Sequence, residues 1–135
     1  MIKYLADTNI LGYFARNGSA ALQKRMLTAL KKQEVAISAV TLAETRFGLA
    51  LLQPDDKRRR TVDLLLKEFP VLPWTGQAAD RYGEIAAHLQ QTGQAIGAMD
   101  TQIAAHTLVL GLYLVTHNTR HFERVPGLKL QDWMD

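Results

Sequence analysis

Short apolar segments alternate with longer amphipathic segments along this chain of 135 residues. The short segments are rich in Val, Ile, Leu and Tyr, and the longer ones repeat apolar residues at helical spacing. This alternation is typical of βαβ units, in which parallel strands form a sheet and helices cover its faces. We therefore expect an α/β fold with a central parallel β-sheet flanked by α-helices on both faces.

The expected elements follow one another without a linker. Strands are predicted at residues 3–6, 35–38, 71–73, 112–115 and 128–130. Helices are predicted at residues 10–14, 20–30, 41–52, 56–69, 77–90 and 99–110. The four prolines lie between or beside these elements, and Gly111 follows the last long helix, where glycine is favoured. A chain of this length without repeats or low-complexity segments is expected to form one domain over residues 1–135.

The composition narrows the chemistry. The chain contains no cysteine, which excludes disulfides, thiolate metal sites and cysteine catalysis. The N-terminus reaches Asp7 without the long apolar run of a signal peptide, and no apolar segment approaches the roughly 20 residues of a membrane helix. We expect a soluble, cytoplasmic protein.

The positive charge is concentrated in the first half of the chain. Residues 1–60 hold 11 Lys and Arg against 5 acids, whereas the remainder holds 5 against 8. This asymmetry suits a polyanionic partner. The run from Lys57 to Arg60 can contact RNA or simply form a solvated helix face, and the sequence does not decide between these readings.

Three acids stand where helices are expected to begin, and each has a simple structural explanation. Asp7 follows the first strand and can cap the next helix. Glu44 stands three residues after Thr41, in the pattern of a capping box, and this cap is the better explanation of Glu44 taken alone. Asp100 falls in the first turn of another helix, where the helix dipole stabilises an acid.

Capping does not require these acids to meet, but a parallel sheet predicts that they do. Its strand-to-helix junctions open on one edge, and Asp7 and Glu44 follow two different strands. Asp100 is expected to approach from the same side. Clustered carboxylates repel one another unless a cation is present, and oxygen ligands favour Mg²⁺, with Mn²⁺ as the alternative.

A fourth junction carries polar side chains after the strand at residues 112–115. Thr116 and Asn118 can supply neutral oxygens to a metal, its waters or a phosphate. His117 and His121 have the spacing of helical zinc ligands, although contact with solvent or phosphate explains them better. His88 and His106 lie in helical runs and are expected to be hydrogen-bonded or exposed.

The chain resembles the PIN-domain ribonucleases and, within them, the VapC toxins of toxin-antitoxin pairs. The matching segments run from Tyr4 to Ile10, Ile37 to Glu44, Gly97 to His106, Leu114 to Arg120 and Phe122 to Leu128. They occur in the family's order over nearly the whole chain. The resemblance implies a PIN-like fold and an acidic metal site that hydrolyses phosphodiester bonds in RNA.

The resemblance places the family's catalytic and metal-binding acids on Asp7, Glu44 and Asp100. The neighbouring polar residues are expected to support the site, namely Thr8, Asn9, Ser38, Thr116 and Asn118. Many relatives carry an acid at the position of Asn118, and close relatives often have glutamate in place of His121. The resemblance therefore implies one well-held Mg²⁺, with a second arriving at most with the substrate.

The same resemblance implies partners and substrates. A VapB-type antitoxin and a homodimer within the toxin-antitoxin complex are expected, with a tRNA anticodon loop or a ribosomal RNA loop as the target. Phe14, Phe47 and Leu51 could form the protein contacts, but at helical spacing they are better explained as core. The alternative function is a PIN-like module that binds RNA or protein with little nuclease activity. An aspartyl-phosphate phosphatase needs an acid at the position of Asn9 and is set aside.

Overall fold

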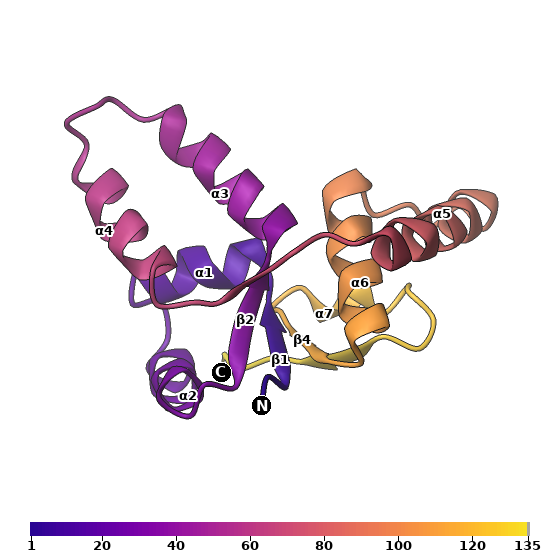
Figure 1. Ribbon diagram of the computed structural model, residues 1–135, viewed down its shortest axis with the longest axis horizontal. Coiled ribbons are helices and arrows are strands. Elements are labelled where there is room, and N and C mark those ends of the chain that lie inside the picture. The colour runs from indigo at the N-terminus through magenta and orange to yellow at the C-terminus, as the bar shows by residue number, and fades with distance from the viewer. Residues whose placement is uncertain (135) are drawn as a thin grey trace.

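A computed structural model describes residues 1–134 and contains the predicted α/β architecture (Figure 1). Five strands form one sheet in the order β3-β2-β1-β4-β5, and every neighbouring pair is parallel. The strands are β1 (Tyr4–Ala6), β2 (Val35–Ser38), β3 (Val71–Leu72), β4 (Tyr113–Val115) and β5 (Lys129–Gln131). All five predicted strands are thus confirmed to within a residue or two at their ends.

The long helices also lie where helical spacing predicts them. They are α1 (Thr8–Ala15), α2 (Ala20–Lys31), α3 (Ala39–Ala50), α4 (Lys57–Leu66), α5 (Gly76–Gln91) and α6 (Ala98–Leu110). One short helix, α7 (Thr119–Phe122), forms within a segment that the sequence suggested only as a polar junction. Within residues 1–134, no helix combines the length and hydropathy needed to cross a membrane.

Alternating strand residues divide the core into two layers. Ala6, Ile37 and Val115 face a cluster completed by helices α1, α2 and α4. Leu5 and Leu114 face the opposite cluster, which α5 and α6 cover together with residues of α7. This alternation follows from the two-residue period of a strand, and it leaves the carboxyl ends of the strands free to carry polar groups.

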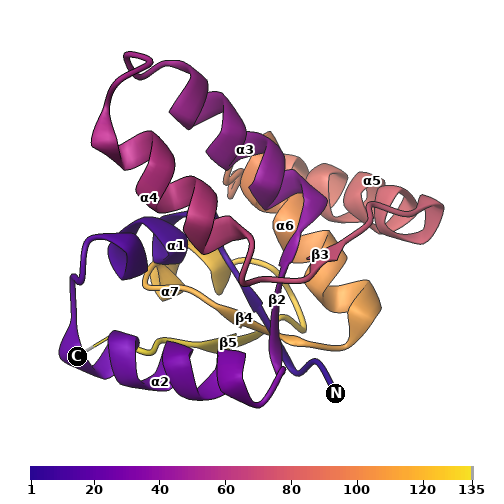
Figure 2. The same ribbon diagram turned by 60° about the vertical axis from the view of Figure 1, so that its left-hand side comes forward.

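Helices α3 and α4 extend beyond the sheet as an arm (Figures 1 and 2). Phe14 is buried, as predicted, but Phe47 and Leu51 of α3 are 67% and 70% exposed. Leu64 of α4 is also exposed. The assignment of Phe47 and Leu51 to the core is therefore wrong, because the arm extends beyond the sheet and residues 1–134 leave both side chains largely uncovered.

Candidate active site at the carboxyl ends of the strands

Asp7 is a buried carboxylate at the junction of β1 and α1. Its Oδ1 accepts a hydrogen bond from the backbone N–H of Ile10 at 2.8 Å, so that it caps α1 as predicted. Its Oδ2 accepts a second bond from the Thr116 hydroxyl at 2.6 Å. The side chain is therefore fixed by two elements that are distant in sequence, and only 3% of the residue is exposed.

Burial dominates the electrostatics of Asp7. Loss of hydration raises the pKa of its carboxyl from 3.8 to about 6, although the bonds from Thr116 and Ile10 oppose that shift. The negative charges of Asp100 and Glu44 make smaller contributions to the same rise. Asp100 and Glu44 are thus near enough to affect the pKa of Asp7, but within residues 1–134 the three acids do not form a tight metal-binding group.

Glu44 reaches this region from α3, but it does so differently from the predicted capping box. Helix α3 begins at Ala39, and Ser38 is its N-cap, with its Oγ accepting from Val40 N–H at 3.0 Å. Thr41 lies inside the helix, fully buried, so the capping-box interpretation is wrong. Glu44 Oε1 instead accepts a bond from the Thr8 hydroxyl at 2.7 Å, which ties α3 to the start of α1.

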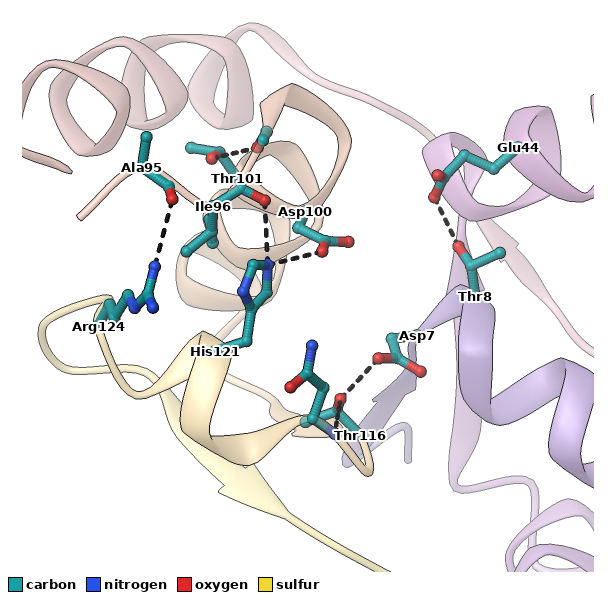
Figure 3. A network of polar contacts seen from close by, with 12 residues as sticks. Asp7, Thr8, Glu44, Ala95, Ile96, Asp100, Thr101, Thr116, His121 and Arg124 are labelled. Carbon is teal, nitrogen blue, oxygen red and sulfur yellow. Dashed lines mark hydrogen bonds and ion pairs between the residues drawn. The ribbon is translucent and has the colours of Figure 1, made fainter. Parts of the chain in front are cut away.

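Asp100 lies in the first turn of α6, as predicted, after Gly97 with a backbone φ of 95°. Its Oδ2 is 3.0 Å from His121 Nε2. Figure 3 shows Asp7, Glu44 and Asp100 on three different elements around a common region, with His121 next to Asp100 and Thr116 next to Asp7. The contact with His121 connects Asp100 to α7, a contact that no local sequence pattern predicts.

The junction after β4 supports Asp7 through Thr116. The Thr116 hydroxyl accepts a bond from Asn118 N–H at 3.0 Å while it donates to Asp7. His117 turns away to Asp132, at 2.9 Å between Nδ1 and Oδ2. His117 and His121 thus contact different acids, and within residues 1–134 they do not join a shared metal-binding group.

Two other expected supporting residues have different surroundings. Ser38 is fully buried, and its Oγ is 2.8 Å from Nδ1 of His106, which is itself buried. Burial lowers the pKa of His106. Asn9 is exposed on the first turn of α1. His88 is exposed as well, as the helical spacing allowed.

The donor set of this region fits a hard divalent cation. Its carboxylate and hydroxyl oxygens are the ligands that Mg²⁺ and Mn²⁺ prefer. A cation would also balance the negative charge of Asp7, which burial and the neighbouring acids disfavour. In the described part of the chain, however, no three His, Asp or Glu side chains are grouped tightly enough to hold one ion as they stand.

Two of the four basic side chains from Lys57 to Arg60, at the start of α4, bind other groups of the same chain. Arg58 pairs with Asp56 at 2.7 Å between Nη2 and Oδ2. Arg59 donates from Nε and Nη2 to the carbonyl oxygens of Leu49 and Ala50, at 3.0 and 3.2 Å. These bonds supply donors to carbonyl oxygens at the C-terminal end of α3, where the helix dipole favours a positive charge. Half of the run therefore has a structural role in the arm.

Comparisons with known proteins show which family the chain is similar to. The PIN domain family matches residues 4–128. The tRNA(fMet)-specific endonuclease VapC of Shigella flexneri is 35% identical over 98% of this chain and 99% of its own length. The ribonuclease VapC2 of Rickettsia felis is 29% identical over 96% and 97%, respectively.

Solved structures give the same relationship. The DNA-bound VapBC crystal structure from Salmonella typhimurium contains a chain with a TM-score of 0.90 and 32% identity, covering 98% of this chain and 99% of that one. A chain of VapBC-1 from nontypeable Haemophilus influenzae has a TM-score of 0.83 and 33% identity, with 98% of both chains covered.

Proposed function

The chain belongs to the PIN-domain family, with VapC ribonucleases among its full-length relatives, and we propose that it is a Mg²⁺-dependent endoribonuclease toxin. The observation that carries this proposal is the buried carboxylate of Asp7, whose pKa is raised by burial and by two further acids at the same sheet edge. A carboxylate that only caps a helix does not require two further acids at the same sheet edge. Perturbed carboxylates of this kind are typical of functional sites.

Asp7 and Asp100 are the residues proposed to hold the cation, with Glu44 beside them. When bound, a divalent ion supplies charge neutralisation at a phosphate and lowers the pKa of a water. Glu44 is oriented by the Thr8 hydroxyl through Oε1. This leaves Oε2 to orient a water molecule and accept its proton while the water oxygen bonds to phosphorus. The bond from phosphorus to the leaving ribose oxygen breaks, and that oxygen takes a proton from solvent.

Basic side chains near α1 are proposed to hold the RNA backbone. Arg16 at the end of α1 and Lys57 of α4 line a groove between the two helices. Since α1 spans eight residues, its two ends lie about 12 Å apart. An RNA strand bound at Asp7 could therefore extend to this groove, with binding that weakens as salt increases.

The substrate is proposed to be a structured RNA cut in a loop, where phosphates and bases are accessible. A tRNA anticodon loop is the first choice because the Shigella relative is named for tRNA(fMet), and a ribosomal RNA loop is the other. Both would be met in the cytoplasm. The VapBC complexes among the structural neighbours support a VapB-type antitoxin as partner. A homodimer or this antitoxin would cover Phe47, Leu51 and Leu64 on the arm.

The test is cleavage of end-labelled tRNA(fMet) by the purified chain and its Glu44→Gln variant at saturating Mg²⁺. Glutamine can still accept the bond from Thr8, so the fold should be kept while the proton acceptor is lost. We expect cleavage to fall by about 10²-fold or more. Glu84→Gln, an exposed change on α5, is the matched control and should cleave like the parent.

The outcomes separate two functions. Equal cleavage by the parent and Glu44→Gln would show that Glu44 does not act on the reaction, and the mechanism would be wrong. If tRNA(fMet) stays intact, the protein is expressed briefly in cells and the ends of the cellular RNAs are mapped to identify any other RNA that it cuts. RNA binding without any metal-dependent cut would favour the alternative, a PIN-like binding module.

A further inference from the structure

His106 of α6 and Ser38 at the start of α3 form a buried hydrogen bond. Nδ1 of His106 is 2.8 Å from the Ser38 Oγ, and the two residues are 1% and 0% exposed, respectively. The ring of Trp74 packs edge-on against the imidazole, with the ring centroids 5.5 Å apart. Because the bond is shielded from water, its loss would leave a buried polar group without a partner.

The surrounding groups determine the direction of this bond. The Ser38 Oγ accepts the backbone N–H of Val40 at 3.0 Å, so its own hydrogen is available to the ring. Nε2 of His106 makes no hydrogen bond within residues 1–134. With its hydrogen on Nδ1, the ring would leave both Nε2 and the Ser38 hydroxyl hydrogen unpaired, whereas with its hydrogen on Nε2 only that nitrogen is unpaired. Ser38 is therefore the donor, and His106 is the acceptor in its neutral form, which burial favours by lowering its pKa.

This bond joins the supports of two acids of the candidate site. Ser38 is the N-cap of α3 and precedes Glu44 on that helix, whereas His106 follows Asp100 on α6. Figure 3 shows Glu44 and Asp100 beside the same region, on their two helices. Within residues 1–134, no other side-chain hydrogen bond or ion pair joins α6 to β2 or α3.

The orientation of α3 determines how far Glu44 lies from Asp100. Glu44 itself is bonded only toward α1, through the Thr8 hydroxyl. Helices α3 and α4 extend beyond the sheet as an arm, so a rotation at the start of α3 would be carried along the helix (Figures 1 and 2). A buried bond at the N-cap opposes such a rotation from the side of α6.

We propose that His106 is a positioning residue, which accepts the Ser38 hydroxyl and thereby fixes the orientation of α3, and with it Glu44, relative to Asp100 on α6. The catalytic consequence of this inference rests on the proposed function. The orientation of α3 does not, because it can be measured without RNA or metal.

Two substitutions of similar shape separate the bond from packing. Asparagine and leucine both branch at Cγ, but in His106→Asn an amide oxygen can take the place of Nδ1 and accept from Ser38, whereas His106→Leu offers no acceptor. Leucine is the better helix former, so a role in stability alone would favour His106→Leu. Thr107→Val is the matched control, because it removes a buried hydroxyl of the same helix that donates to Ile103 within α6.

Spin labels measure the orientation of α3 in EDTA. The chain contains no cysteine, so Ala50→Cys and Leu110→Cys, at exposed residues near the ends of α3 and α6, introduce two unique labelling sites. Double electron–electron resonance should give one narrow distance distribution in the parent, His106→Asn and Thr107→Val. The distribution should shift or broaden in His106→Leu and in Ser38→Ala, which removes the donor instead. The same distribution in every protein would overturn the inference.

Cleavage of end-labelled tRNA(fMet) at saturating Mg²⁺ measures the catalytic consequence. His106→Leu should lower kcat by about 10- to 100-fold with KM unchanged, because Glu44 is displaced while the RNA contacts on α1 are kept. His106→Asn should recover most of this loss. Circular dichroism verifies folding, and Ser38→Ala retains both tests if His106→Leu does not fold.

The outcomes are distinct. A kcat that is higher in His106→Leu than in His106→Asn, in the order of their stabilities, would overturn the inference and leave the proposed function intact. A folded parent that leaves this RNA uncut would count against the proposed function, and the spin-label distances would still decide whether His106 fixes α3.

Discussion

Replacing Asp7 with asparagine should make the metal-free protein more stable at neutral pH. The pKa of Asp7 is raised from 3.8 to about 6, and a difference of about two pH units corresponds to about 3 kcal/mol against the charged form. Asparagine removes this charge and keeps an oxygen that accepts from Ile10 N–H. It weakens the bond from the Thr116 hydroxyl, at a cost of about 1 kcal/mol.

The net expectation is an increase of about 2 kcal/mol in the free energy of unfolding, or about 7 °C in Tm for a chain of this size. The sign depends on pH. The folded state binds the proton of Asp7 more tightly than the unfolded state, so the parent loses stability as pH rises from about 4 to about 6. Below this interval both states carry a neutral Asp7, and the advantage of the variant should vanish.

Urea unfolding in the presence of EDTA, followed at neutral pH and at a pH below this interval, measures the effect. Asp56→Asn is the matched control, because Asp56 also caps a helix but its pKa is lowered to about 2 by Arg58. That variant should lose stability at neutral pH. Two results would refute the claim that burial disfavours the charge of Asp7. One is an Asp7→Asn protein that is less stable than the parent at neutral pH. The other is a variant whose gain in unfolding free energy is as large at low pH as at neutral pH.

Two further substitutions test how the site is held. Thr116→Val removes the hydrogen bond that lowers the pKa of Asp7, so NMR titration in EDTA should show that pKa above its parental value, whereas Thr116→Ser should leave it unchanged. An unmoved pKa in Thr116→Val would remove the hydroxyl from this role. Gly97→Ala forces a side chain into a backbone φ of 95° and should lower the free energy of unfolding by about 1 to 3 kcal/mol in urea titration. Gly48→Ala, inside α3 with open space around it, should be neutral or stabilising, and equal effects at both glycines would contradict the strain at Gly97.

The fold could be predicted because each strand carries its own signal. Val35 to Ser38 is a short apolar run between polar residues, and it forms β2 with the predicted bounds. The burial of Leu5 and Ala6 on opposite faces of β1 requires only the two-residue period of a strand. The residue pattern of each strand was sufficient to predict it, because a strand in this sheet packs and pairs with neighbouring strands of the same sheet.

The errors arose where two local patterns compete or where a partner is distant. Ser38 and Thr41 can each cap a helix, and the earlier residue does so because α3 begins directly after β2. Phe47 and Leu51 have the spacing of core residues, and the sequence does not show that the arm leaves the sheet. The bond between His121 and Asp100 joins residues 21 positions apart, and only the folded chain brings them together.

Capping and catalysis are not competing explanations of Asp7, and the comparison with Asp56 shows why. Both aspartates accept a backbone N–H at the start of a helix. The cap at Asp56 favours the charged carboxylate, and its pKa falls to about 2 because Arg58 donates to it. At Asp7 the same kind of cap is combined with burial and two acidic neighbours, so the charge is disfavoured. Capping therefore explains the position of Asp7 but not its charge environment, which a bound cation would balance.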